Sequence, residues 1–142
     1  MDLLKNGRHR VVISGMGAVT ALGNVKSLWE GLKAGKSGIR RLETINIEHV
    51  PVKIGGEVRN FDPTQYIEPK EARRMGRASH FAVAAANMAA EDAGLTKDDI
   101  EREGERVGVV IGTTLGAHEM AEQNTFKYKT SGFRKPNPLT LI

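Results

Sequence analysis

The sequence predicts an α/β fold in which helices cover a mostly parallel sheet. Two short, β-branched apolar runs, at residues 10–15 and 106–112, end in glycine and have no polar face, which is typical of buried strands. Helical patterns occupy the chain between and after them, so strands and helices alternate. The 142 residues fit one domain, and a hydrophobic content of 39% is enough for a packed core.

The first helix is expected to begin after Asn24, which suits an N-cap, and to end at Gly35. The apolar residues of this helix share one face: Leu28, Trp29 and Leu32. Residues 36–53 are expected to be irregular. A short strand is predicted over residues 53–58, before a turn at residues 60–63.

A cationic stripe is predicted at residues 69–77, because four basic residues recur there at i, i+3, i+4 and i+7 and would share one face of a helix. They are Lys70, Arg73, Arg74 and Arg77. Such a face suits an acidic partner, although Glu68 and Glu71 would partly neutralise it. Eight alanines lie between Ala78 and Ala93, where a helix is expected from about Ser79 to Gly94 that would pack closely on several sides.

Two more helices are predicted in the last third of the sequence. Thr96 with Asp99 three residues later is typical of a capping box, so a short, exposed helix is expected to begin there and to end near Gly104. A polar helix is expected from Gly116 through Phe126.

Composition argues against several classes of function. The formal net charge is only +4 and 5% of residues are aromatic, which disfavours nucleic-acid binding. The sequence has no cysteine, and its four histidines are scattered, so neither a metal site nor a bound cofactor is expected. No apolar stretch has the length that a membrane span requires, and we expect a cytoplasmic protein.

Two glycine-containing turns allow alternative interpretations. Residues 15–20 follow a predicted strand as a dinucleotide-binding loop would, but Thr20 stands where the third glycine belongs, which favours a structural turn over nucleotide binding. Residues 112–116 would present backbone N–H groups to an anion, yet they lack the lysine of a P-loop. Leu115 is expected instead to line an apolar cavity or to pack at an interface.

Five segments, taken in order, resemble the β-ketoacyl-acyl carrier protein synthases, especially type II of bacterial fatty acid synthesis. They are residues 10–24, 28–39, 70–75, 84–95 and 106–116. The resemblance implies a thiolase-like fold, in which duplicated halves place mixed sheets around buried helices. Residues 1–142 would then be an incomplete N-terminal domain of that fold, ending before the family's nucleophilic cysteine and containing no catalytic residue.

The same resemblance implies an acyltransferase of lipid metabolism. Its members condense acyl thioesters with malonyl-acyl carrier protein by decarboxylative Claisen condensation, which implies acyl carrier protein as partner and a homodimer, with no cofactor. The chain alone is expected to be inactive. The alternative is a non-catalytic or split subunit that keeps the carrier-protein and dimer surfaces and leaves the chemistry to a partner.

Matching positions carry two of the family's functions over to this sequence. The resemblance implies that Lys70, Arg73 and Arg74 contact the acidic carrier protein. It implies that Leu115 is an apolar gate to the acyl pocket, and that Thr140 and Leu141 line this pocket across the dimer interface. Thr140 replaces an aromatic residue that is frequent there.

Three further positions differ from the family pattern. Gly76, Ala78 and His80 stand where the family usually has Asp, Phe and Gln. Glycine inside a helix costs roughly 1 kcal/mol relative to alanine, so Gly76 is expected to loosen the helix around it.

Overall fold

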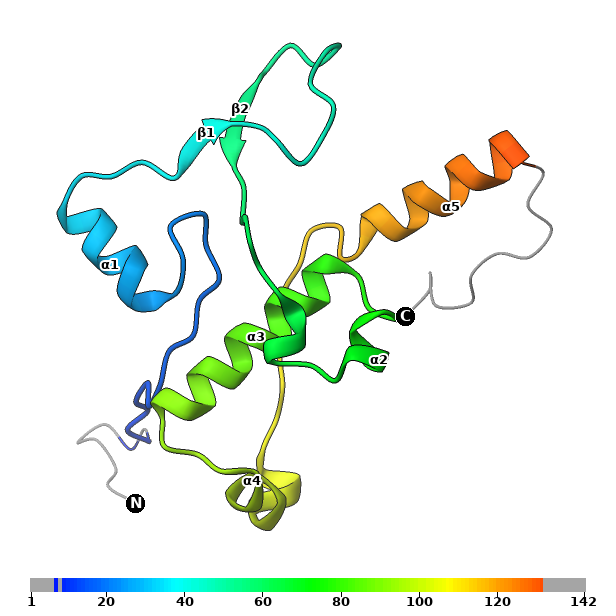
Figure 1. Cartoon of the computed structure of the whole chain (residues 1–142). Coiled ribbons are helices and arrows are strands. Elements are labelled where there is room, and N and C mark those ends of the chain that lie inside the picture. The colour runs from blue at the N-terminus through cyan, green and yellow to red at the C-terminus, as the bar shows by residue number, and fades with distance from the viewer. Residues whose placement is uncertain (1–6, 8, 132–142) are drawn as a thin grey trace.

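The structure is a computed structural model that describes residue 7 and residues 9–131 (Figure 1). Its central element is the long helix α3, with α4 beyond its C-terminal end and α5 leading away from its N-terminal end (Figure 1). The elements in chain order are α1 (Val25–Lys33), β1 (Ile39–Arg41), β2 (Ile54–Gly56), the 3₁₀ helix η1 (Pro63–Gln65), α2 (Pro69–Ala72), α3 (Arg77–Asp92), α4 (Lys97–Glu103), the 3₁₀ helix η2 (Gly104–Arg106) and α5 (His118–Ser131).

Helix α1 begins and ends where its local sequence predicts. The Asn24 side chain accepts a hydrogen bond from the Ser27 amide at 3.1 Å, as an N-cap does. Gly35 has a φ of +64°, a left-handed conformation that glycine adopts without steric cost and that ends the helix.

Strands β1 and β2 form a two-stranded antiparallel ribbon, with Ile39 opposite Gly56 and Arg41 opposite Ile54. The predicted strand over residues 53–58 is thus confirmed as β2. The expectation that residues 36–53 are irregular misses β1. The mostly parallel sheet is also wrong for the described residues, whose one sheet is this ribbon.

The two predicted buried strands, residues 10–15 and 106–112, are not strands in the described structure. Their apolar side chains face solvent, with Val11 88% and Val110 99% exposed. A buried strand needs neighbouring strands that receive its backbone hydrogen bonds, and β1 and β2 pair only with each other. An apolar run indicates that a segment tends to be buried. Burial also requires a neighbouring segment that packs against it.

The predicted continuous helix at residues 69–77 is interrupted. Helix α2 ends at Ala72, and Gly76 is extended (φ −77°, ψ 163°) at the N-cap of α3. Gly76 therefore separates two helices and does not loosen one. The alanine-rich helix itself is confirmed, although it begins at Arg77 and not near Ser79; it stops before Gly94, whose φ is +67°.

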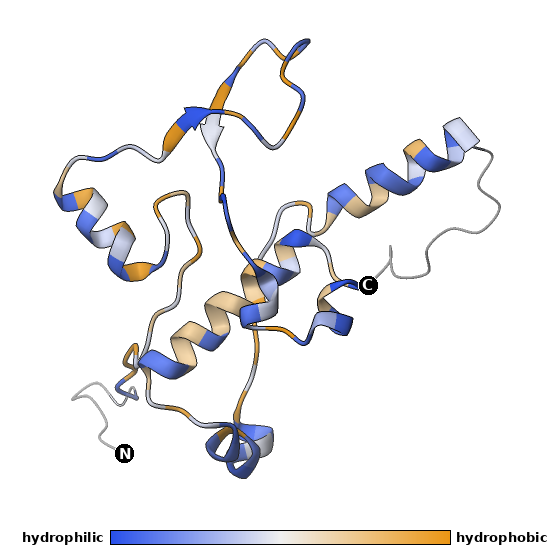
Figure 2. Ribbon diagram, viewed as in Figure 1, coloured by the Kyte–Doolittle hydropathy of each residue, from blue (hydrophilic) through white to orange (hydrophobic). Residues whose placement is uncertain are grey.

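Helix α3 carries the centre of the packing, and Figure 2 shows apolar colours along most of it, whereas α4 and α5 are largely hydrophilic. Ala84 of α3 is fully buried. The backbone at Gly15 and Gly17 lies directly on this helix: a Cβ built on Gly17 would overlap Ala85 O and lie 2.8 Å from Ala89 N. Glycine is required at both positions because no side-chain atom fits there.

The predicted helices of the last third are confirmed. Thr96 and Asp99 form the expected capping box at the start of α4, and Gly104, with a φ of +46°, follows its last residue. Helix α5 begins at His118, close to the expected start at Gly116. Within the described part of the chain, no helix combines the length and apolarity needed to cross a membrane.

Glu57 stabilises the end of the ribbon. Its carboxylate accepts the Thr44 hydroxyl at 2.5 Å, the Thr44 amide at 2.9 Å and the Glu43 amide at 2.9 Å, and it is paired with Arg59 at 3.0 Å. The Thr44 hydroxyl and these other donors favour the ionised carboxylate and lower the pKa of Glu57 from 4.5 to about 2.

We predict that Gly17→Ala lowers the free energy of unfolding by about 1–3 kcal/mol, because the new methyl group must separate residues 15–17 from α3. Urea unfolding followed by circular dichroism measures the change. The control is Gly108→Ala, since a Cβ at Gly108 meets no atom within 4 Å. Equal effects of the two substitutions would contradict the close contact.

Acid is predicted to weaken the ribbon through Glu57. Because the pKa of Glu57 is lower in the folded state, its stabilising contribution is complete above about pH 4.5 and is lost as the pH falls toward 2. Urea midpoints measured across this pH range should fall more steeply for the wild type than for Glu57→Gln. Glu48→Gln, at an exposed position, serves as the control and should retain the wild-type slope.

Candidate functional site

The basic residues of α2 and the turn after it form a compact surface, which we call the basic patch: Lys70, Arg73 and Arg74. All three are exposed. Arg74 lies 3.4 Å from the Glu71 carboxylate in an open ion pair, which is worth little in water. The side chains of Lys70 and Arg73 form no ion pair with any described residue, so two cations are available to a partner and the third is weakly held.

Arg77 does not belong to this patch, contrary to the four-residue stripe that the spacing predicts. Its guanidinium group donates to Val58 O and lies over the Phe81 ring, 4.8 Å from the centroid. These contacts exist because the helix break at Gly76 turns Arg77 away from α2. The i, i+3, i+4, i+7 spacing assumes one continuous helix, and it fails at Arg77 because that helix has ended before this residue.

The basic patch is attached to α3 by His80. The ring Nε2 of His80 lies 2.7 Å from the carbonyl oxygen of Ala72, the last residue of α2, so the imidazole donates this hydrogen bond as its Nε2–H tautomer. Ala72 is itself buried. The sequence did not predict this role of His80. The one indication of it was that His80 replaces the family's glutamine, another side chain with an N–H donor.

An apolar cavity of about 370 Å³ lies directly beyond the basic patch, between the start of α3 and the segment 111–116. Its first lining residue, Met75, follows Arg74 in sequence. The remaining lining residues are mostly small or apolar: Ala78, Ser79, Ala82, Val83, Ile111, Gly112, Thr113 and Gly116. A cationic surface and an apolar cavity are therefore adjacent, as binding of a molecule with an acidic and an apolar part requires.

Leu115 lies on the segment that borders this cavity and is 69% exposed. The Thr113 hydroxyl accepts a hydrogen bond from the Gly116 amide at 3.0 Å, and Gly116 has a φ of +57°, so the segment turns sharply around Leu115. The structure thus brings Leu115 near the cavity without placing it among the lining residues. Thr140 and Leu141 lie outside the described residues.

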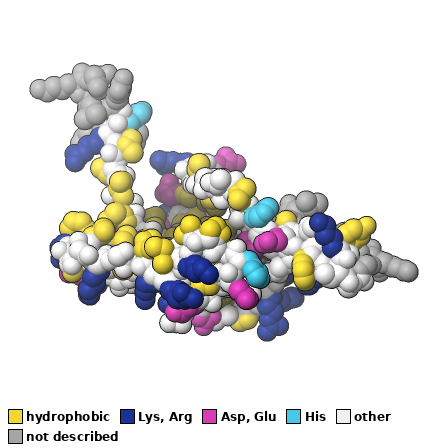
Figure 3. Space-filling model, turned by 90° about the horizontal axis from the view of Figure 1, so that it is seen from above, with side chains coloured by type: hydrophobic (Ala, Val, Ile, Leu, Met, Phe, Trp, Pro, Cys, Tyr) yellow, Lys and Arg dark blue, Asp and Glu magenta, His cyan; other side chains and the backbone are white. Residues whose placement is uncertain are grey.

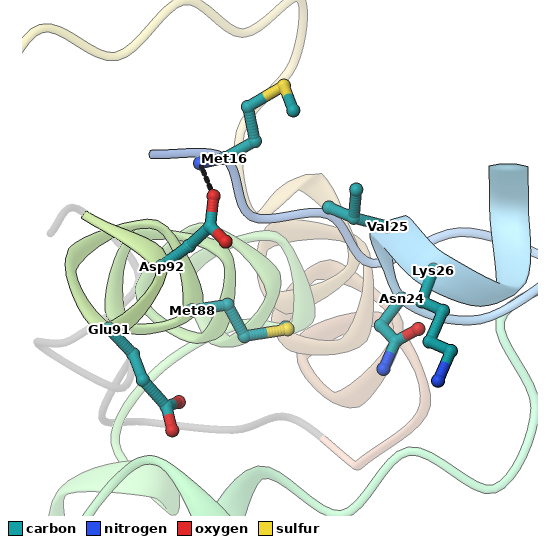
Figure 4. A pocket seen from close by; sticks show the side chains of 7 residues that line it. All are labelled: Met16, Asn24, Val25, Lys26, Met88, Glu91 and Asp92. Atoms are coloured by element: carbon teal, nitrogen blue, oxygen red, sulfur yellow. Dashed lines mark hydrogen bonds between the residues drawn. The ribbon is translucent and has the colours of Figure 1, made fainter. Parts of the chain in front are cut away.

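A second cavity lies where residues 15–20 meet α1 and the C-terminal end of α3 (Figure 4). Here the Met16 amide, which a bound phosphate would need as a donor, donates instead to the Asp92 carboxylate at 2.9 Å. Glu91 adds a second acidic side chain to the lining (Figure 4). These two carboxylates would repel a phosphate, so the geometry disfavours the nucleotide-binding alternative.

Metal-binding chemistry has no support from the described part of the chain, in which no three His, Asp or Glu side chains are grouped as metal ligands. Large apolar surfaces are exposed instead. Figure 3 shows hydrophobic side chains in several clusters on the visible face, with Lys and Arg side chains among them. The most exposed large hydrophobic residues in the described part of the chain belong to the two unpaired segments: Val11, Ile13, Val109 and Val110.

Comparisons with known proteins identify the family that this chain resembles. The family model described as "Beta-ketoacyl synthase, N-terminal domain" matches residues 8–140. Among solved structures, the ishigamide ketosynthase/chain length factor matches with a TM-score of 0.78 and 33% identity over 94% of this chain and 33% of that one. A β-ketoacyl synthase from Burkholderia phymatum matches with a TM-score of 0.69 and 32% identity, covering 89% of this chain and 31% of that one.

The chain belongs to the β-ketoacyl synthase family. It is similar to the 3-oxoacyl-[acyl-carrier-protein] synthase 2 of Coxiella burnetii, with 39% identity over 92% of this chain and 31% of the relative. The Staphylococcus aureus (strain COL) protein of the same name is 40% identical over 91% of this chain and 31% of the relative. The chain thus spans about a third of the length of the curated relatives it matches, and its fold is that of the N-terminal part of a ketosynthase.

Proposed function

We propose that this chain supplies the carrier-protein-binding, N-terminal part of a 3-oxoacyl-[acyl-carrier-protein] synthase of fatty acid biosynthesis. One observation carries the proposal: the basic patch of α2 lies next to an apolar cavity on α3. Acidic carrier protein would bind the three cations, and the acyl chain that it delivers would enter the apolar region beside Leu115. The proposed setting is a cytoplasmic homodimer in which Thr140 and Leu141 complete the acyl pocket.

In the proposed reaction, a cysteine thiolate of the family's catalytic part attacks the acyl thioester and releases the carrier-protein thiol. Malonyl-carrier protein then loses carbon dioxide, and the electron pair left on its α-carbon attacks the acyl-cysteine carbonyl and expels the cysteine thiolate. Oxyanion donors stabilise the charge that develops on each carbonyl oxygen. The residues of this chain contribute to binding and orientation of the acyl-carrier protein.

A non-catalytic or split subunit is the second candidate function, and the exposed apolar surface favours it. Val11 and Val110 belong to two apolar segments that no described strand pairs with. Apolar surface of this kind marks a protein interface. A subunit with this surface would bind a partner that holds the cysteine while it keeps the basic patch for the carrier protein.

Charge reversal of the basic patch is predicted to weaken carrier-protein binding. The triple variant Lys70→Glu, Arg73→Glu, Arg74→Glu should raise the Kd for acyl carrier protein at least tenfold, about 1.4 kcal/mol, and flatten its dependence on salt. Isothermal titration calorimetry at several salt concentrations measures both.

The matched control for this prediction reverses three exposed lysines elsewhere, Lys26, Lys127 and Lys129, and so changes the net charge equally. It should retain most of the affinity. Equal losses in the two triple variants would show that only the overall charge matters, which would refute a docking role for α2.

The chain alone is predicted to form no covalent acyl-protein when incubated with radiolabelled acyl-carrier protein. The family's nucleophile is a cysteine thiol, and the 142 residues contain no cysteine. Gel autoradiography measures the transfer, with the Staphylococcus aureus relative as a positive control. Stable acylation of the chain would refute the interpretation that its role is binding and orientation.

A further inference from the structure

Helix α3 begins without a capping side chain of its own. Its N-cap is Gly76, and no hydrogen bond from a cap side chain is present. The amide of Arg77, the first residue of the helix, donates instead to Glu119 Oε1 at 2.5 Å. Glu119 lies 42 residues further along the chain, so a residue of α5 performs for α3 the function that an Asp or Ser usually performs locally.

Gly76 is the residue that permits this contact. A Cβ built on it would overlap the Ala117 side chain and lie 2.9 Å from Glu119 Oε1. Gly76 itself is buried. The missing side chain therefore leaves α3 without a local cap and at the same time gives the start of α5 the space to approach the start of α3.

The Glu119 carboxylate lies at the N-terminal ends of two helices. It is in the first turn of α5 and accepts from the first residue of α3, and both ends carry the positive partial charge of unpaired N–H groups. Glu119 is half-buried. A cationic side chain would be repelled by both helix ends.

This contact also holds the segment that carries Leu115. The segment 112–116 leads directly into Ala117, which packs on Gly76, and it borders the same cavity as Met75 and Ala78. On its other side Gly76 follows Arg74 of the basic patch by two residues. The Gly76–Glu119 contact is therefore the junction between the proposed docking surface and the segment beside the apolar cavity.

We propose that Glu119 is a positioning residue that caps α3 from α5 and thereby sets the place of the Leu115 segment relative to the basic patch. The contribution of Glu119 to acyl transfer rests on the proposed function, but its structural role does not depend on any bound molecule. Loss of the carboxylate should release the start of α3 and the segment 112–117 together. Loss of an ordinary exposed glutamate of α5 should affect neither.

The test uses the full chain and three variants: Glu119→Ala, Glu119→Gln and, as control, Glu122→Ala, which removes an exposed carboxylate from the next turn of α5. Amide hydrogen exchange is measured at Arg77 and at residues 113–117. Glu119→Ala should accelerate exchange at Arg77 and in this segment at least tenfold. Glu119→Gln should change it less than threefold, because the amide oxygen still accepts from the Arg77 N–H.

A spectroscopic measurement complements the exchange data, since the absence of native cysteine allows site-specific labels. Spin labels at Leu115→Cys and Ala86→Cys report the distance between the segment and α3, both positions being exposed. The distance distribution should broaden in Glu119→Ala and return to the wild-type width in Glu119→Gln. Far-ultraviolet circular dichroism identifies any variant that has merely unfolded. If Glu119→Ala is unfolded, the proposal is judged on Glu119→Gln, which must keep the wild-type exchange and distance width.

The proposal is overturned if Arg77 exchanges at the wild-type rate in Glu119→Ala, or if Glu122→Ala has the same effect. Acceleration confined to residues 118–122 would also overturn it, because that pattern reports only the support that Glu119 gives its own helix. The proposed function fails separately: if reversal of the basic patch leaves carrier-protein affinity unchanged while Arg77 responds to Glu119, the positioning role stands and the docking role falls.

Discussion

The described structure depends on one close approach, that of the backbone at residues 15–17 to the alanine face of α3. Gly15 and Gly17 have no side chain to separate them from the helix, and Ala85, Ala89 and Ala93 offer only methyl groups in return. Backbone atoms therefore meet backbone atoms across this contact. Either set of small residues alone would leave a gap, because close packing requires both surfaces to be free of bulk.

Because this contact fixes α3, structural elements that would not be stable alone are held in defined positions against it. The four residues of α2 are too few to form a stable helix alone. Its carbonyl at Ala72 is held by His80 of α3, and the amide of Arg77 is held by Glu119 of α5. The basic patch and the apolar cavity thus share one support, and their relative placement is a property of α3.

The sequence predicts those elements whose determinants are local. The caps at Asn24 and at Thr96 with Asp99, and the glycines that follow α1, α3 and α4, act within four residues and lie where they were expected. The two apolar segments failed as strands because strand formation depends on a partner elsewhere in the chain. The roles of His80 and Glu119 were missed for the same reason, since their contacts join residues that no spacing rule connects.

The helical spacing rule places Lys70, Arg73 and Arg74 on one surface, although the continuous helix that it assumes is interrupted at Gly76. Lys70, Arg73 and Arg74 lie within one turn because helical hydrogen bonding continues past α2, from the Arg73 amide to Pro69 O and from the Arg74 amide to Glu71 O. The periodicity therefore holds up to Arg74 and fails at Arg77, beyond the extended residue Gly76. The break that removes Arg77 from the patch is also what brings α5 against α3, so a shorter cationic surface and a defined junction to the Leu115 segment arise from the same glycine.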